Sequence, residues 1–234
     1  MQQGNEDSDY SEDYWIEWFL SIKGNEYFCE IDTEFILDKF NLTGLNTEVV
    51  HLQMAIDIIT DNFTHTGPEL SEKDREKLEH SASHLYGLIH ARYIVTSRGL
   101  QRMMEKYKNG DFGYCPRVHC EKAPLLPIGL HDMPHQASVR LYCPMCEDLY
   151  VPRSAKHAMI DGAYFGTSFP GMLFQVHTYL VPEKTTERFV PKIFGFKIHE
   201  HAKLARWQER KRIEMEKKIQ KFEQIKEKKK NSVN

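Results

Sequence analysis

The sequence contains no long apolar run and no large excess of either charge. None of its apolar runs approaches the ~20 residues that a membrane-spanning helix needs. The N-terminal stretch is acidic and lacks the apolar region of a signal peptide. The 31 Lys and Arg residues nearly balance the 34 Asp and Glu residues, and charge alone therefore disfavours nucleic acid as a partner. We expect a protein of the cytoplasm and nucleus with no membrane partner.

Cysteine is also scarce, and four of the five cysteines form two short pairs. Cys115 and Cys120 make the first pair, Cys143 and Cys146 make the second, and twenty-two residues separate the pairs. Two thiolates on one tight turn can bind one side of a tetrahedral ion, and a second such turn can bind the other side. The spacing predicts a structural zinc site of ribbon type with one ion per chain, and a four-cysteine site leaves no open position for water.

Two further residues near or outside this pattern need an interpretation. His119 is an alternative ligand, but it adjoins Cys120 too closely for both to bind one ion comfortably. Cys29 is remote in sequence, and we expect it to be a buried small hydrophobic residue.

The first half of the chain has helical periodicity. Ser71 with Asp74 resembles a capping box for a long helix that would bury Leu78, Ala82, Leu85 and Ile89. Asp32 is expected to cap a helix reaching Phe40. Other helices are expected at residues 14–20 and 46–59, and through Met103 to Tyr107 after an interruption at residues 98–99, with an end at residues 109–110.

The second half changes character, because Pro and Gly become frequent between residues 111 and 191. Short runs at residues 139–142 and 172–176 predict strands. The stretch between the two cysteine pairs is apolar, and a small ribbon cannot enclose all of its side chains. We expect some to form a self-complementary dimer patch, the alternative being that they pack against the helices; the candidates are Leu125, Leu126, Ile128, Leu130, Val139 and Leu141.

One short stretch of the sequence matches part of a catalytic motif. Asp111-Phe112-Gly113 spells the magnesium-binding triplet of protein kinases, but the sequence has no glycine-rich loop, no strand lysine in the kinase context and no His-Arg-Asp loop. The triplet precedes the first cysteine pair, where a turn into the ribbon is the better interpretation. We predict no catalytic residue and favour a binding or scaffold protein over an enzyme.

A series of stretches matches one known family in order along the chain: WIEWF at 15–19, GNEYFCE at 24–30, DKFNLTGLN at 38–46, LYGLIHARY at 85–93, EKY at 105–107, GDFGYCPRV at 110–118, LPIGL at 126–130, DGAYFGT at 161–167 and FVPKIFGFKIH at 189–199. Through these stretches the chain resembles the regulatory beta subunit family of casein kinase II. The resemblance implies a zinc-ribbon homodimer that binds two catalytic subunits, giving a heterotetramer. It also implies that the chain stabilises the kinase and changes its choice of Ser/Thr protein substrates.

The resemblance gives residues 193–198 a specific role. Alternation places Phe194, Phe196 and Ile198 on one face of a strand, with Ile193 beginning it. From the residues alone this is a core strand, although the glycine between the aromatics also permits a close partner or a tight turn. The resemblance implies a hairpin whose aromatic side chains enter a groove on the kinase's N-terminal lobe.

The resulting fold class is α+β. The expected parts are a disordered acidic arm at 1–13, an α-helical domain at 14–110, a zinc-ribbon dimerisation domain at 111–180, a docking segment at 181–199 and a basic tail, helical or disordered, at 200–234.

The two ends and one loop carry further expectations. Ser8 and Ser11 lie among acids and are candidate phosphorylation sites, although neither has an acid three residues downstream. The family's loop at 61–70 is densely acidic and implicated in polyamine binding, whereas this one also contains Phe63, His65 and Thr66. The alternative function is a zinc-ribbon nucleic-acid-binding or transcription-associated protein that uses the basic tail.

Overall fold

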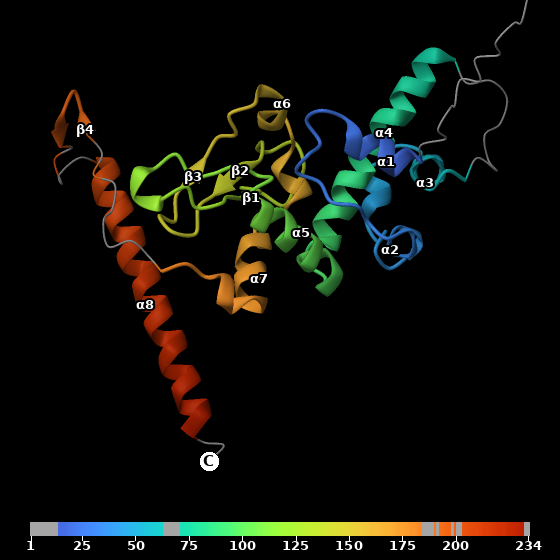
Figure 1. Cartoon of the computed structure of the whole chain (residues 1–234). Helices are drawn as coiled ribbons and strands as arrows, with labels where there is room; N and C mark the ends of the chain where they lie inside the picture. The colour runs from blue at the N-terminus through green and yellow to red at the C-terminus, as the bar shows by residue number, and fades with distance from the viewer. Residues whose placement is uncertain are drawn as a thin grey trace, which may run out of the picture. The chain divides into compact units, whose positions relative to one another are not determined.

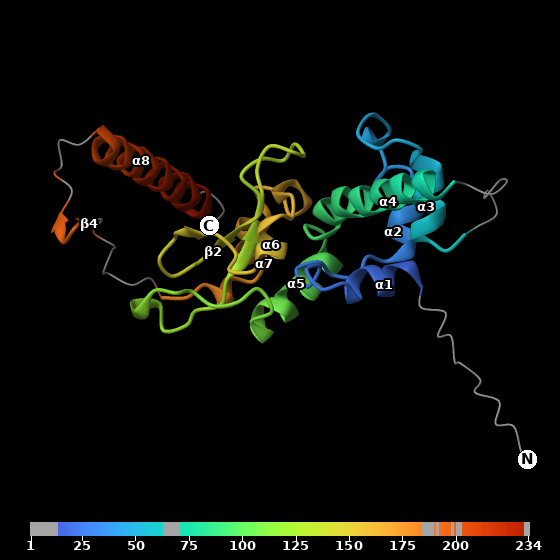
Figure 2. The ribbon, with the colours of Figure 1, turned by 90° about the horizontal axis from the view of Figure 1, so that it is seen from above.

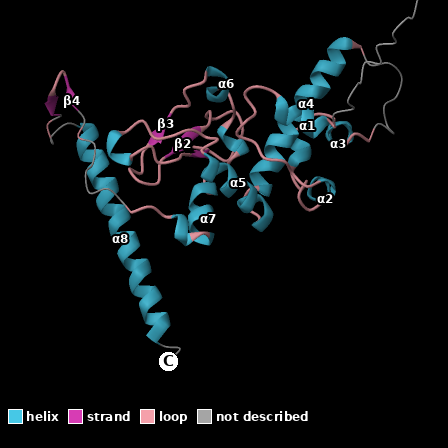
Figure 3. Cartoon of the chain, viewed as in Figure 1, coloured by secondary structure: helices cyan, strands magenta, loops and turns pink. Residues whose placement is uncertain are grey.

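The computed structural model describes residues 14–62, 71–183, 190, 192–197, 199 and 203–231. Two compact units are present, one extending to Thr185 and the other beginning at Thr186. The expected helical and ribbon regions therefore share the first unit, and the division into functional domains stays a prediction. Helices predominate in the first half of the chain and the short strands lie in the second half (Figures 1 and 3). No helix in the described part is long and apolar enough to cross a bilayer.

The helical region is organised around the long helix α4. Its helices are α1 (Trp15–Ser21), α2 (Thr33–Leu37), α3 (Leu52–Ile59), α4 (Glu72–Tyr93) and α5 (Ser97–Asn109), with a 3-10 turn η1 (Leu45–Thr47). Helix α3 packs beside α4 (Figure 2). The predicted buried face of α4, at Leu78, Ala82, Leu85 and Ile89, is confirmed. The predicted cap is also confirmed, because the Ser71 hydroxyl accepts a hydrogen bond from the Asp74 N–H at 3.3 Å.

Asp32 precedes α2 as predicted, but its side chain does not cap that helix. Its carboxylate instead accepts from Arg98 at 3.0 Å, from Arg102 at 2.8 Å and from the Tyr93 hydroxyl at 3.1 Å. Cationic donors bind a carboxylate more strongly than a backbone N–H does. Helix α2 then ends at Leu37, and the predicted extension to Phe40 is wrong.

Two other predicted helix boundaries differ from the structure. Residues 45–47 form only a 3-10 turn, and α3 begins at Leu52. Arg98 and Gly99 do not interrupt the chain but lie in the first turn of α5, which Thr96 caps by accepting from the Gly99 N–H at 3.2 Å. A Cβ on Gly99 would lie 2.1 Å from the Tyr93 carbonyl oxygen, and the glycine therefore permits α5 to start close against the end of α4.

The ribbon region contains one small antiparallel sheet of order β1-β2-β3. The strands are β1 (Leu126–Ile128), β2 (Arg140–Tyr142) and β3 (Leu149–Tyr150), and Leu141 pairs with both Pro127 and Tyr150. Strand β2 confirms the strand predicted at 139–142. The remaining elements of this region are η3 (Val118–Cys120), α6 (Ala155–Ala158), η4 (Gly162–Tyr164), α7 (Phe169–Val176) and η5 (Thr178–Leu180).

The strand predicted at 172–176 is wrong, because these residues belong to α7. Pro170 lies in the first turn of that helix, where its fixed φ and missing N–H are favourable. Phe169 and Leu173, one helical turn apart, are both buried. A short apolar run fits a buried strand and a buried helix equally well. The proline before this run indicates the start of a helix.

One buried core joins the helical and ribbon regions. The ring of Phe28 lies 5.4 Å from that of Phe165. His90 on α4 contacts both sides: its Nε2 accepts from the Cys29 N–H at 3.1 Å, and its Nδ1 lies 2.8 Å from the Tyr164 carbonyl oxygen. Because Nε2 is the acceptor, Nδ1 carries the proton and donates it to Tyr164. Cys29 is buried as predicted, and this Cys–His pair has a structural role.

The second unit contains a hairpin and a helix. Strand β4 (Lys192–Ile193) pairs antiparallel with β5 (Phe196–Lys197), and α8 spans Lys203–Asn231. The hairpin that the resemblance implies is present, whereas a continuous strand over residues 193–198 is not, because Phe194 and Gly195 form a turn with φ values of 49° and 85°. Two positive φ values are typical of the tight turn that joins two antiparallel strands. The basic tail, which the sequence left as helical or disordered, forms helix α8 over Lys203–Asn231.

Candidate metal centre and docking hairpin

The first cysteine pair lies on a turn closed by backbone hydrogen bonds. The Cys115 N–H donates to the Ala123 carbonyl at 2.8 Å, and the Ala123 N–H donates to the Cys120 carbonyl at 2.7 Å. Glu121 and Lys122 have left-handed φ values of 46° and 59°, and they reverse the chain directly after Cys120. These bonds direct both sulfurs of the pair to one side.

The second pair lies on a similar turn. The Cys143 N–H donates to the Asp148 carbonyl at 3.1 Å, and the Glu147 N–H donates to the Cys143 carbonyl at 2.8 Å. The Arg117 guanidinium of the first turn binds the Asp148 carboxylate of the second at 2.6 Å. This ion pair fastens the two turns to each other beside the thiols.

The structure brings together the four cysteines that the spacing singled out. Their sulfur atoms all lie within 4.8 Å of one another, and those of Cys115 and Cys146 are 3.9 Å apart. Zinc bound tetrahedrally at about 2.3 Å would set its sulfurs about 3.8 Å apart. Three of the four cysteines are buried. The donors fit one metal ion, and in the part of the chain that the structure describes no other His, Cys, Asp or Glu group meets the same test.

The electrostatics of the cluster call for a cation. Burial, together with the adjacent thiols, raises the pKa of Cys120 to about 11, and burial likewise raises the pKa of Cys143. Burial also acts to raise the pKa of Cys146, but hydrogen bonds from the Tyr150 hydroxyl, at 3.2 Å, and from the Asp148 backbone leave it lowered. Four adjacent thiolates repel one another, and a divalent cation stabilises them all.

Sequence reasoning missed three groups that support this site: Arg117, Asp148 and Tyr150. The side chains of Arg117 and Asp148 join the two turns, and the Tyr150 hydroxyl bonds a sulfur. The signal for Tyr150 was its place four residues after Cys146 in a strand facing the cluster. Nothing in the sequence pairs Arg117 with Asp148, because the contact spans the stretch between the turns.

The candidate dimer residues divide by burial. Leu125, Leu126, Val139 and Leu141 are enclosed in the chain's own core, which also contains Met103 of α5. Ile128 is partly buried, and Leu130 is exposed. The dimer stays a prediction, and only these last two side chains offer surface to a partner.

The docking candidates lie on the hairpin with their side chains exposed. Phe194 is 96% exposed and Phe196 is 79% exposed, and Ile193, paired with Phe196, is also exposed. Ile198 lies outside the described residues, as do Ser8 and Ser11. Asp111 pairs with Lys106 at 3.4 Å and Phe112 is buried, so the kinase-like triplet forms a turn into the ribbon.

A helical region, a small antiparallel sheet and a four-thiol cluster together define a helical protein with a zinc-ribbon-like metal site. The sequence pattern of the family described as "Casein kinase II regulatory subunit" matches residues 14–197. The chain belongs to this family.

Named relatives agree with this assignment. The casein kinase II subunit beta-2 of Neurospora crassa is 57% identical over 217 residues, covering 93% of this chain and 75% of the relative. The casein kinase II subunit beta of Schizosaccharomyces pombe is 55% identical, covering 86% of each chain. The casein kinase II subunit beta' of Saccharomyces cerevisiae is 51% identical, covering 92% of this chain and 85% of the relative.

Proposed function

We propose that this chain is a non-catalytic regulatory subunit that binds the catalytic subunit of casein kinase II and modulates its activity and its choice of Ser/Thr protein substrates. The observation that carries the proposal is the family match, which spans residues 14–197, from the first described helix to the hairpin β4–β5. The kinase-like triplet forms a turn in which Asp111 pairs with Lys106 at 3.4 Å and Phe112 is buried.

The metal in this proposal is zinc, one ion per chain, bound by Cys115, Cys120, Cys143 and Cys146. Buried thiolates at tetrahedral spacing suit zinc, and a closed set of four protein ligands makes the ion structural. The ion would join two turns that are distant in sequence. It would also compensate the cost of ionising buried thiols.

The proposed kinase contact is the hairpin β4–β5. Phe194 and Phe196 gain little from their own fold, because most of each ring is exposed. Large aromatic side chains that become buried at an interface commonly provide much of its binding free energy. A groove on the catalytic subunit would provide that burial.

The proposed assembly is a homodimer carrying two catalytic subunits. Leu130 belongs to a set of exposed apolar side chains in the ribbon region that also includes Val118, Leu149 and Val151. Exposed apolar surface of this kind is typical of a contact between copies.

The five free cysteines suit a reducing compartment, and we place the assembly in the cytoplasm and nucleus.

Co-purification with a casein kinase II catalytic subunit tests the proposal. We expect a complex whose mass corresponds to two copies of each chain, and altered kinase activity on protein substrates when this chain is added. A chain that binds DNA in a salt-dependent way and fails to bind the kinase would instead be the nucleic-acid-binding alternative.

A further inference from the structure

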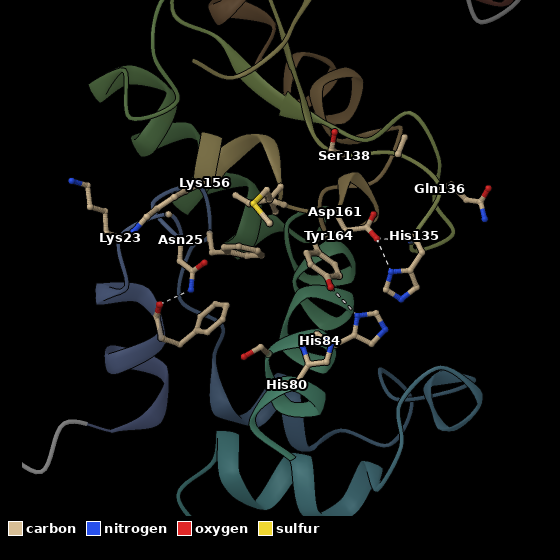
Figure 4. Close-up of a pocket in the computed structure, with 17 residues that line it drawn as sticks. Lys23, Asn25, His80, His84, His135, Gln136, Ser138, Lys156, Asp161 and Tyr164 are labelled. Carbon is tan, nitrogen blue, oxygen red and sulfur yellow. Dashed lines mark hydrogen bonds and ion pairs between the residues drawn. The ribbon is translucent and has the colours of Figure 1, made fainter. Parts of the chain in front are cut away.

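A cleft of about 840 Å³ lies between the helical region and the ribbon loops. Its walls include residues of α4, the loop at 135–138, Met159 directly after α6, and the turn η4. Three imidazole side chains, those of His80, His84 and His135, lie next to one another along one wall (Figure 4). Neither the thiol cluster nor the docking hairpin involves this cleft.

The three histidines come from two parts of the chain. His80 and His84 are four residues apart on α4, and they therefore project from the same face one helical turn apart. His135 comes from the loop between β1 and β2, and its ring stacks on that of His84 with centroids 5.3 Å apart and planes 19° apart. Two imidazoles in this helical spacing are a common pair of metal ligands.

One nitrogen of the His84 ring has a hydrogen-bond partner, and one nitrogen of the His135 ring lies near a carboxylate. His84 Nδ1 lies 2.8 Å from the Tyr164 hydroxyl. His135 Nδ1 lies 3.7 Å from a carboxylate oxygen of Asp161, whose other oxygen accepts from the Ala163 N–H at 2.9 Å (Figure 4). Metal-binding histidines typically have such a partner on the second nitrogen, because it fixes the tautomer and the ring orientation.

We propose that His80, His84 and His135 form a second metal site for a divalent transition ion such as Zn²⁺. Among the described residues only the four thiols have their donor atoms close enough to share one ion as the structure stands. The histidine side chains would have to rotate to bring their nitrogens together around an ion. His80 and His135 are both exposed, and rotation about their side-chain bonds would bring their nitrogens to the ion. The bound ion would connect α4 to the loop at 135–138.

Equilibrium dialysis of the full chain against micromolar Zn²⁺ tests the proposal. We expect the parent to bind one more zinc per chain than a His80→Ala/His84→Ala/His135→Ala variant, whatever the thiol cluster holds. The parent's thermal midpoint should rise on adding zinc, and that of the triple variant should rise less. His131→Ala, an exposed histidine close to His135 in the same loop, is the matched control and should retain the additional ion.

Tyr164→Phe keeps the aromatic ring and removes only the hydroxyl that orients His84. Loss of such a partner typically lowers metal affinity about 10- to 100-fold, and we expect that decrease at the additional site alone. Equal zinc binding by the parent and the triple variant would overturn the proposal. So would an additional zinc in the parent that His131→Ala removes, because the ion would then be bound elsewhere in the loop.

Discussion

The docking hairpin yields a quantitative prediction for the double variant Phe194→Ala/Phe196→Ala. Full burial of a phenylalanine side chain stabilises by about 1.5–3 kcal/mol. Because 96% of Phe194 and 79% of Phe196 remain exposed, nearly all of this free energy is still available to a partner. The two rings together could contribute about 3–5 kcal/mol to binding, which corresponds to a roughly 100- to 4000-fold change in Kd.

The assay is titration of the catalytic subunit against parent and variants at fixed salt concentration. We expect the double variant to lose tight binding, and Phe196→Ala alone to weaken binding more than Phe194→Ala alone. Zinc content and dimer mass should not change, because neither ring is buried in the fold.

Phe40→Ala is the matched control, since Phe40 is an equally large side chain that is 83% exposed in the other unit. It should bind the catalytic subunit as the parent does. If the double variant binds as tightly as the parent, the docking site lies elsewhere in the chain. If it unfolds instead, residues 192–197 belong to a core that the described contacts do not contain.

Three further predictions concern the first unit. Cys143→Ser should lose zinc in metal analysis and unfold the ribbon region by circular dichroism, because binding at such sites is worth about 10–16 kcal/mol; Cys29→Ala, outside the cluster, should keep the metal. Burial lowers the pKa of His90 from 6.5 to about 4, and the stability that neutral His90 contributes is therefore fully present above about pH 6.5. The free energy of unfolding should fall by about 3 kcal/mol as the pH falls to 4, because the unfolded state then binds a proton more readily than the folded state does. Denaturant titrations of His90→Gln should lack this dependence. Gly87→Ala should lower the free energy of unfolding by about 1–3 kcal/mol, because the added Cβ would lie 2.5 Å from an aromatic ring of η4. In the same denaturation assay Gly171→Ala, whose Cβ would lie in open space on α7, should be neutral or stabilising by up to about 1 kcal/mol.

The thiol cluster was predictable because its geometry is mostly local. A proline after the first cysteine of each pair and a short spacing determine each turn, and the chemistry of four thiolates supplies the reason for the turns to meet. The supporting ion pair of Arg117 with Asp148 was not predictable, since it depends on how the two turns face each other. The tyrosine at position 150 reaches a sulfur only because β3 pairs with β2.

Burial of the apolar stretch between the cysteine pairs was harder to predict than its composition suggested. Helix α7 packs against β1, and this is the helix that the sequence interpretation assigned as a strand. Four of the six candidate dimer side chains are buried within the chain itself, and Ile128 and Leu130 remain for the predicted contact between copies.

The tip of the hairpin has an unfavourable backbone conformation. Phe194 adopts a left-handed backbone conformation with φ of 49°, which costs a residue other than glycine about 1–3 kcal/mol. Its ring is almost fully exposed and recovers little of that cost by burial among the described residues. Glycine or asparagine would form the same turn at lower cost. An aromatic residue at this position is thus unfavourable for the isolated fold. The proposed docking supplies a physical reason for it, because a partner would bury the exposed ring.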